Sequence, residues 1–258
     1  MAARDISPSF CLLTPHPLGN LQVKGKHGVS CMNEVNHEAI EQMRVIINAV
    51  MAPEDSGKAN RSSARTEILI HAIPVFSTRG LERTTVQHLL DAAAVSRRTF
   101  YKYFKNKHDV LESIYEIFVE NMVHMFRIQA QRAATVNEVI GNTFAIYFDY
   151  HFKLGPILRL MAEEARRTES VLWPHRDKAF QSTAQVLQAE MHRVSGRKHE
   201  LLVFNTIIWA LESCSLHVLT NTDCSEPVLA HYRNVMTGIA EAILVDGTSA
   251  ALFAPQGQ

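Results

Sequence analysis

The chain has 258 residues, of which 47% are hydrophobic and 20% charged, and its formal net charge is zero. This composition is typical of a globular protein with a sizeable core, and it excludes an intrinsically disordered chain. The charge is unevenly distributed, because residues 61–108 contain nine lysines and arginines against three acids. Such a basic block is a solvated surface in many proteins, and it points to phosphate contact when a binding motif accompanies it.

The chain contains four cysteines: Cys11, Cys31, Cys214 and Cys224. They lack metal-ligand spacing and the density of a disulfide framework, so we expect no metal site and a reduced, cytoplasmic location. A redox pair of Cys214 and Cys224 is disfavoured, because no activating cation neighbours either residue in the sequence. An early Asp5 argues against a signal peptide, and polar residues interrupt the best candidate membrane span, Leu201–Leu219.

Residues 1–60 are expected to form a poorly ordered N-terminal extension. Residues 1–31 mix Pro, Gly, Ser and His without periodicity, and translation that begins at Met32 would omit them. Within residues 34–51, apolar side chains recur at helical spacing, which predicts an amphipathic helix. Residues 52–63 are polar and rich in turn-forming residues, as in a linker.

Residues 61–108 are predicted to form a compact basic unit, which we call the head. Its first helix runs from about residue 64 to 78, and Pro74 inside it is expected to kink the helix or interrupt its hydrogen bonding. Gly80 is expected to end this helix. Thr84 or Thr85 would then cap a second helix, whose buried side includes Val86, Leu89, Leu90 and Ala93.

A third helix, capped by Ser96, is both basic and aromatic. A short helix, a tight turn and such a second helix form the layout of a helix-turn-helix, whose second helix enters the major groove of DNA. Arg97 and Arg98 occupy its first turn, from which side chains reach base edges or phosphates. The spacing of Phe100 and Phe104 turns both rings towards the core.

The remaining polar and aromatic side chains of this unit are expected to be exposed beside the DNA backbone. Lys107 begins the next helix and adds a charge and helix-terminal N–H groups for phosphate contact. The candidate DNA-contacting residues are Thr84, Thr85, Ser96, Arg97, Arg98, Thr99, Tyr101, Lys102, Tyr103 and Lys107.

Residues 109–248, which we call the body, show helical periodicity throughout, and residues 249–258 are a tail. Helices are expected over 107–131, 135–153, 155–168, 176–194, 198–219 and 226–245, and strand alternation is absent. The fold class is therefore all-α: an N-terminal three-helix head with a helix-turn-helix, followed by a helical body.

The segment from Arg65 to Leu111 resembles the DNA-binding domain of the TetR family of bacterial transcriptional regulators. The resemblance rests on the string Val-Ser-x-x-Thr-Phe-Tyr-x-Tyr-Phe-x-x-Lys at residues 95–107, preceded by Gly80 and Thr84-Thr85-Val86. The chain departs from the family at Ala94, where Gly is usual in the turn, and at Leu90, where a small residue is common. Ala94 must then adopt a left-handed backbone conformation without glycine.

The resemblance implies a homodimer that binds a pseudo-palindromic operator. The family dimerises through its last two long helices, here about 198–219 and 226–245. It also implies a small-molecule effector that binds in the body and moves the helix at 107–131, with no other cofactor. The candidate effector-binding residues are apolar, aromatic or sulfur-containing: Met122, Phe144, Tyr147, Phe148, Met161, Trp173, Trp209 and Cys214.

The sequence also bears on three other functions. An enzyme is disfavoured, because the sequence lacks a Gly-x-Ser-x-Gly elbow, a P-loop, a dinucleotide-binding glycine fingerprint and a His-Glu-x-x-His motif. An interaction protein with a degenerate helix-turn-helix would have little reason to retain Arg97, Arg98, Lys102 and Lys107 together. An activator with the same fold stays open, because the sign of regulation depends on where the operator lies.

Overall fold

The computed structural model describes residues 41, 43–48, 64–220 and 225–245. Within these residues every regular element is helical, which confirms the all-α fold class. The helices in chain order are α2 (Ala64–Arg83), α3 (Val86–Ala93), α4 (Arg97–Tyr103), α5 (Lys107–Arg132), α6 (Val136–Ala165), α7 (Trp173–Ser195), α8 (Leu201–Thr220) and α9 (Glu226–Leu244).

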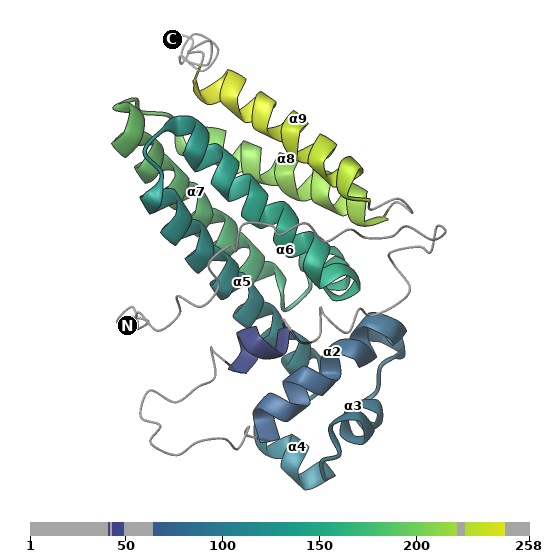
Figure 1. Cartoon of the computed structure of the whole chain (residues 1–258). Helices are drawn as coiled ribbons and strands as arrows, with labels where there is room; N and C mark the ends of the chain where they lie inside the picture. The colour runs from purple at the N-terminus through teal and green to yellow at the C-terminus, as the bar shows by residue number, and fades with distance from the viewer. Residues whose placement is uncertain (1–40, 42, 49–63, 221–224, 246–258) are drawn as a thin grey trace.

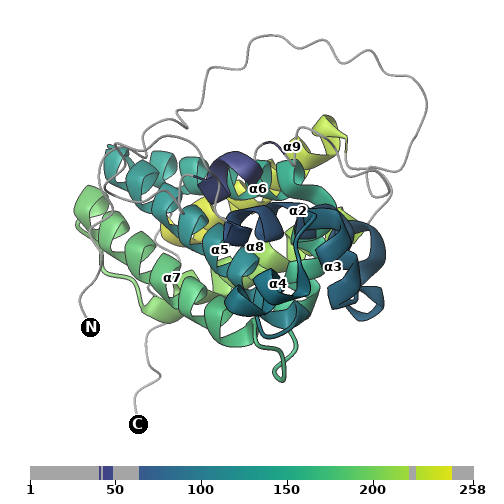
Figure 2. The same ribbon diagram turned by 90° about the horizontal axis from the view of Figure 1, so that it is seen from below.

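The head consists of α2, α3 and α4 and lies at one end of the molecule (Figure 1). Helix α5 runs from the head into the body, where α6, α7, α8 and α9 pack around and beyond it. The view along the molecule from the head end shows α3 and α4 in front of the body helices (Figure 2). A movement of α5 would therefore change the position of the head directly.

Two breaks in helical geometry lie close to where the sequence predicts them. In α2 the non-helical residue is Gly80, at φ 70° and ψ 170°, and the backbone keeps helical angles at Pro74, so the helix is not kinked at the proline. Proline has no N–H group, so the helical hydrogen bond from this position is missing, as expected. In α6 the non-helical residue is Gly155, at φ 50° and ψ −123°, between the two helices predicted for this region. Both glycines adopt a backbone conformation that residues with a Cβ atom rarely reach.

The apolar core forms two clusters stacked along the molecule. The first joins the head to the lower half of α5, the second half of α6 and Leu172. The second lies between the upper half of α5, the first half of α6, α7, α8 and α9. Because the first cluster is continuous from head to body, the head is fixed to the body by side-chain packing as well as by the backbone of α5.

Part of the N-terminal extension contributes to the first cluster. Residues 43–48 are helical, within the amphipathic helix predicted over 34–51, whose other residues apart from Glu41 lie outside the described part of the chain. Met43, Ile46 and Ile47 are almost completely buried, at the helical spacing that makes one apolar face. In Figures 1 and 2 this short segment lies beside α5 and α2, at the junction of head and body.

Candidate nucleic-acid interface and regulatory core

The turn between α3 and α4 is built from local hydrogen bonds. Thr85 caps α3: its hydroxyl accepts from the His88 amide at 3.3 Å, and its own amide donates to Nδ1 of His88 at 3.2 Å. Ser96 caps α4 by accepting from the amide of Thr99 at 3.1 Å. Between the caps Ala94 adopts φ 50° and ψ 40°, the left-handed conformation expected for the turn. The sequence thus fixes the relative direction of α3 and α4.

Helix α4 separates a buried face from an exposed one, as predicted. Phe100 and Phe104 are buried in the core of the head, with ring centroids 5.8 Å apart. On the opposite side, 51% of Tyr101 is exposed, and Arg97, Arg98 and Lys102 are exposed as well. An exposed face that carries three cations and a phenol at the start of a short helix suits contact with phosphates and base edges.

Two of these cations are held by neighbouring side chains. Nη2 of Arg97 donates to Oε1 of Gln87 at 2.9 Å, and Gln87 in turn donates to Oδ1 of Asp91 at 2.8 Å. Nζ of Lys102 lies 5.3 Å from the centre of the Tyr103 ring, a cation–π contact. Arg97 is therefore held close to α3, whereas Arg98 extends from the exposed first turn of α4.

Two of the candidate contact residues make contacts inside the protein instead. Thr84 is buried, and its hydroxyl donates to the carbonyl of Gly80 at 2.7 Å. Nζ of Lys107 donates to the carbonyls of Leu81 and Glu82 at 2.7 and 3.1 Å. Lys107 thus places its charge at the C-terminal end of α2, where free carbonyls attract cations. We therefore omit Thr84 from the proposed interface and give Lys107 a role in positioning the start of α5.

The aromatic residues proposed for the effector site are packed against one another in the second core cluster. Phe144, Tyr147 and Phe148 are buried there, and Tyr147 stacks on Phe126 with ring centroids 6.3 Å apart. Met122 and Cys214 lie at the edge of this cluster.

The environment of Cys214 does not favour redox chemistry. Its Sγ lies 3.4 Å from Sδ of Met236, and burial raises the pKa of the thiol. A raised pKa disfavours the reactive thiolate, in keeping with the expectation against a redox pair. Cys224 lies outside the described residues.

The other three candidate effector residues, Met161, Trp173 and Trp209, lie outside the second core cluster. Met161 is buried in the first cluster, near the head, and not in the second. Trp173 and Trp209 are 37% and 48% exposed. The helical spacing places Trp209 on a face of α8 that other body helices do not cover, so its side chain does not line the interior of the body.

A buried ion pair in the body was not expected from the sequence. Arg176 on α7 donates through Nε and Nη2 to the two carboxylate oxygens of Glu212 on α8, at 2.7 and 2.5 Å. The side chains are only 16% and 6% exposed. These residues are 36 positions apart, on helices with no motif to connect them, and only the packing of α7 on α8 brings them together.

Two tyrosines lie close to this pair. Burial raises the pKa of the phenols of Tyr115 on α5 and Tyr147 on α6, and the nearby charge of Glu212 raises both further. Both hydroxyls are therefore neutral at any physiological pH and can donate hydrogen bonds. Among the candidate effector residues, Tyr147 has a pKa that responds to these charged groups.

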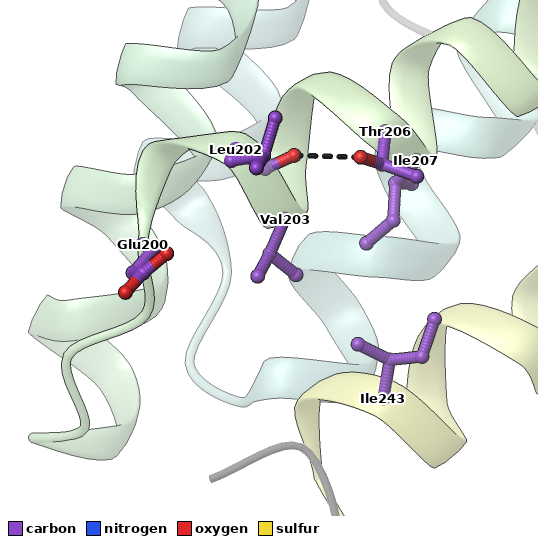
Figure 3. Close-up of a pocket in the computed structure, with 6 residues that line it drawn as sticks. All are labelled: Glu200, Leu202, Val203, Thr206, Ile207 and Ile243. Carbon is purple, nitrogen blue, oxygen red and sulfur yellow. Dashed lines mark hydrogen bonds between the residues drawn. The ribbon is translucent and has the colours of Figure 1, made fainter. Parts of the chain in front are cut away.

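Two small hollows are found among the described residues. One, of about 100 Å³, lies where α8 meets α9 and is lined by Glu200, Leu202, Val203, Thr206, Ile207 and Ile243 (Figure 3). The other, of about 290 Å³, lies between α5 and α7 and has a mixed lining that includes Arg127, Gln185 and Val186. Neither contains a residue proposed for the effector site.

Helices α8 and α9 expose an apolar surface next to the first hollow. Leu202 and Trp209 on α8 and Val235 and Ile239 on α9 are each about half exposed. Helix α8 is also long and apolar enough to cross a membrane, and half of its most apolar window is buried within the body. Surfaces that bind other proteins commonly expose large apolar side chains of this kind.

No metal site is evident in the part of the chain that the structure describes, where no three His, Cys, Asp or Glu side chains are grouped to hold an ion.

Comparison with known proteins gives matches of two kinds. Residues 68–114 match the family described as bacterial regulatory proteins, tetR family. The HTH-type transcriptional repressor KstR2 of Rhodococcus jostii is 34% identical over 76 residues, which cover 30% of this chain and 36% of the repressor. The match thus spans about a third of the length of that curated relative.

Solved structures share the helical fold over most of the chain. A tetR-family regulatory protein from Rhodococcus RHA1 superimposes with a TM-score of 0.58 at 17% identity, over 70% of this chain and 98% of that one. FadR of Bacillus subtilis, solved in complex with stearoyl-CoA, gives a TM-score of 0.55 at 20% identity, over 70% and 97%. At these identities the likeness shows the fold alone. Residues 68–114 therefore match the tetR family of bacterial regulatory proteins, and the described residues share the helical fold of a solved protein of that family.

Proposed function

We propose that this chain is a ligand-responsive transcriptional repressor that binds a pseudo-palindromic operator as a homodimer. The observation that carries the proposal is the exposed face of α4, where Arg97, Arg98, Tyr101 and Lys102 project from a helix held by two capped turns. The curated relative that matches the head is itself a repressor. The second helix of a helix-turn-helix presents such side chains to the major groove, while neighbouring residues contact phosphates.

The test of operator binding is a titration of the purified protein with its own upstream intergenic DNA, in excess nonspecific competitor and at several salt concentrations. We expect tight binding that weakens steeply with salt, because phosphate contacts release counterions. Arg98→Ala should reduce both the affinity and the salt dependence. Lys178→Ala is the matched control, since Lys178 is an exposed cation on α7 of the body. Binding indifferent to salt, or equally weakened by both variants, would refute the proposed interface.

The homodimer is proposed to form through α8 and α9. The exposed apolar side chains Leu202, Trp209, Val235 and Ile239 lie on these two helices, and a second copy of the same face would bury them. Two-fold symmetry of the protein would then match the symmetry of the operator. Sedimentation of the wild type and of Trp209→Glu tests this: we expect a dimer and a monomer, respectively. A wild-type monomer at micromolar concentration would contradict the dimer.

The effector is proposed to be an acyl-CoA whose acyl chain enters the body. The second core cluster offers an apolar, aromatic environment around Phe126, Phe144 and Phe148, and a relative of the same fold has been solved with stearoyl-CoA. Release of operator DNA on addition of lauroyl-CoA, followed by fluorescence anisotropy, tests this part of the proposal. An operator complex unaffected by acyl-CoAs of any chain length would exclude this class of effector while leaving the DNA-binding function intact.

A further inference from the structure

The body contains one polar cluster whose presence in an apolar core calls for an explanation. Arg176 and Glu212 form its centre, with Tyr115 and Tyr147 close enough to sense the charge of Glu212. The ring of Phe180 covers the guanidinium, whose Cζ lies 4.3 Å from the ring centroid. The cluster therefore brings together residues of four helices, α5, α6, α7 and α8.

A hydroxyl without a partner lies on the same face of α8. Oγ of Ser215 is completely buried and is the one buried side-chain polar atom without a hydrogen-bond partner among the described residues. Ser215 is three positions after Glu212, and this spacing places the two side chains on one helical face. Buried polar groups in native proteins are rarely left unpaired, because an unpaired group has lost its hydrogen bonds to water. A group that accepts a hydrogen bond from this hydroxyl, on the face of α8 that also carries Glu212, would remove the cost of leaving it unpaired.

The charge balance of the cluster limits the chemistry of that ligand. The positive charge of Arg176 is already matched by Glu212, which accepts from two of the guanidinium nitrogens. A second carboxylate placed here would be an uncompensated buried charge, which is strongly unfavourable. A carbonyl or hydroxyl oxygen adds no charge, and it can accept from Ser215 and from guanidinium N–H groups that Glu212 does not use.

We propose that Arg176 and Ser215 recognise an uncharged oxygen, carried as a carbonyl or hydroxyl on the apolar part of the effector. This inference rests on the proposed function, since it names the chemistry within the same effector site. A plain hydrocarbon chain would leave Ser215 unpaired, and an anion would disturb the ion pair. The site therefore selects an acyl chain that carries a carbonyl or hydroxyl over an unsubstituted one.

The same turn of α7 connects this cluster to the head. His175, next to Arg176, lies with Nε2 2.8 Å from Oε1 of Glu112 and with Nδ1 3.3 Å from Oε1 of Glu116, both on α5. The side chains of Arg176 and Glu212 are only 16% and 6% exposed, and neither hollow described above reaches them. A ligand that accepts hydrogen bonds from Arg176 must therefore shift the first turn of α7 against α8. Through the contacts of His175 with Glu112 and Glu116, this shift would also move α5 and the head.

The test compares two probes that differ by one oxygen, lauroyl-CoA and 11-oxododecanoyl-CoA, whose ketone lies near the far end of the chain. Affinities are measured by calorimetry for the wild type, Ser215→Ala and Ser195→Ala. Ser195 is the matched control, because its hydroxyl already donates to the Met191 carbonyl, near the opposite end of α7 from Arg176. Melting temperatures are recorded for all three proteins.

We expect the wild type to bind the ketone at least about fivefold more tightly than lauroyl-CoA, as one added hydrogen bond allows. Ser215→Ala should lose this preference while its Tm rises by about 2–4 °C, since the orphaned hydroxyl is gone. Ser195→Ala should keep the preference. Equal wild-type affinities for both probes, or a preference that survives in Ser215→Ala, would overturn the inference and leave the acyl-CoA proposal standing. If neither probe binds the wild type, this inference and the acyl-CoA proposal are both refuted.

Discussion

Replacing Ala94 by glycine should stabilise the protein, although it removes a side chain. Among the described residues, Ala94 is the one non-glycine residue with a positive φ. It adopts φ 50° in the turn of the helix-turn-helix. The left-handed conformation costs an L-residue with a Cβ atom roughly 1–2 kcal/mol. Glycine avoids this cost. It also has more conformational freedom in the unfolded chain, which lowers the stability gained by about 0.4–1 kcal/mol.

At the midpoints of these two ranges the difference is a net stabilisation of about 0.8 kcal/mol. Ala94 is exposed, so little packing is lost, and its amide can still donate to the carbonyl of Leu90. For a chain of this length the gain corresponds to a rise in Tm of about 1–4 °C. The backbone of the turn is unchanged, and operator affinity should stay within about twofold of the wild type.

Urea unfolding of Ala94→Gly and Ala92→Gly provides the test. Ala92 is the matched control, because it lies within α3 in helical conformation, where glycine costs roughly 0.5–1 kcal/mol. The two substitutions are chemically identical and two positions apart, and they should change the free energy of unfolding in opposite directions. If Ala94→Gly destabilises the protein as Ala92→Gly does, the strain assigned to the turn does not exist.

Four further predictions follow from particular side chains. Tyr101→Ala should weaken operator binding at least about fivefold without changing Tm, because half of this ring is exposed; loss of both together would make it a core residue. Lys107→Met should lower the free energy of unfolding by about 1 kcal/mol, measured in urea, since its amino group no longer binds the carbonyls at the end of α2. Ile47→Ala should cost about 2–4 kcal/mol in the same assay, although Ile47 lies outside the region that matches the family; a loss below about 0.5 kcal/mol would show that its segment does not pack in solution. Burial lowers the pKa of His124 and His199, so the folded protein binds fewer protons than the unfolded chain, and stability should fall as the pH drops through about 6.5. The double variant His124→Gln/His199→Gln should flatten that fall in chemical unfolding measured between pH 7.5 and 5, and an unchanged slope would exclude these two histidines as its cause.

Much of the head could be predicted from the sequence because its structure is specified locally. A cap such as Ser96 satisfies an amide three residues away, and the spacing of Phe100 and Phe104 alone decides which face of α4 is buried. These interactions lie within one or two helical turns, where residue type and spacing are sufficient. The exposure of Tyr101 on the opposite face follows from the same periodicity.

Contacts between residues distant in the sequence could not be predicted in this way. The sequence placed Lys107 at the start of a helix, and only the fold brought its amino group to the end of α2, 26 residues earlier. Trp209 was assigned to the interior for its size and type, whereas the packing of α8 leaves it on an outer face. Residue type gives the tendency to be buried, but the arrangement of neighbouring helices decides which apolar face is covered.

The sequence by itself determined the helical class, the helix-turn-helix and the basic face of α4, because each depends on periodicity, caps and charge within short segments. Only the tertiary structure decided that Arg176 meets Glu212 beside an unpaired Ser215, and that residues 43–48 complete the core between head and body. The physical reason is that burial and pairing are properties of several helices packed together, and no single segment carries the information that determines them.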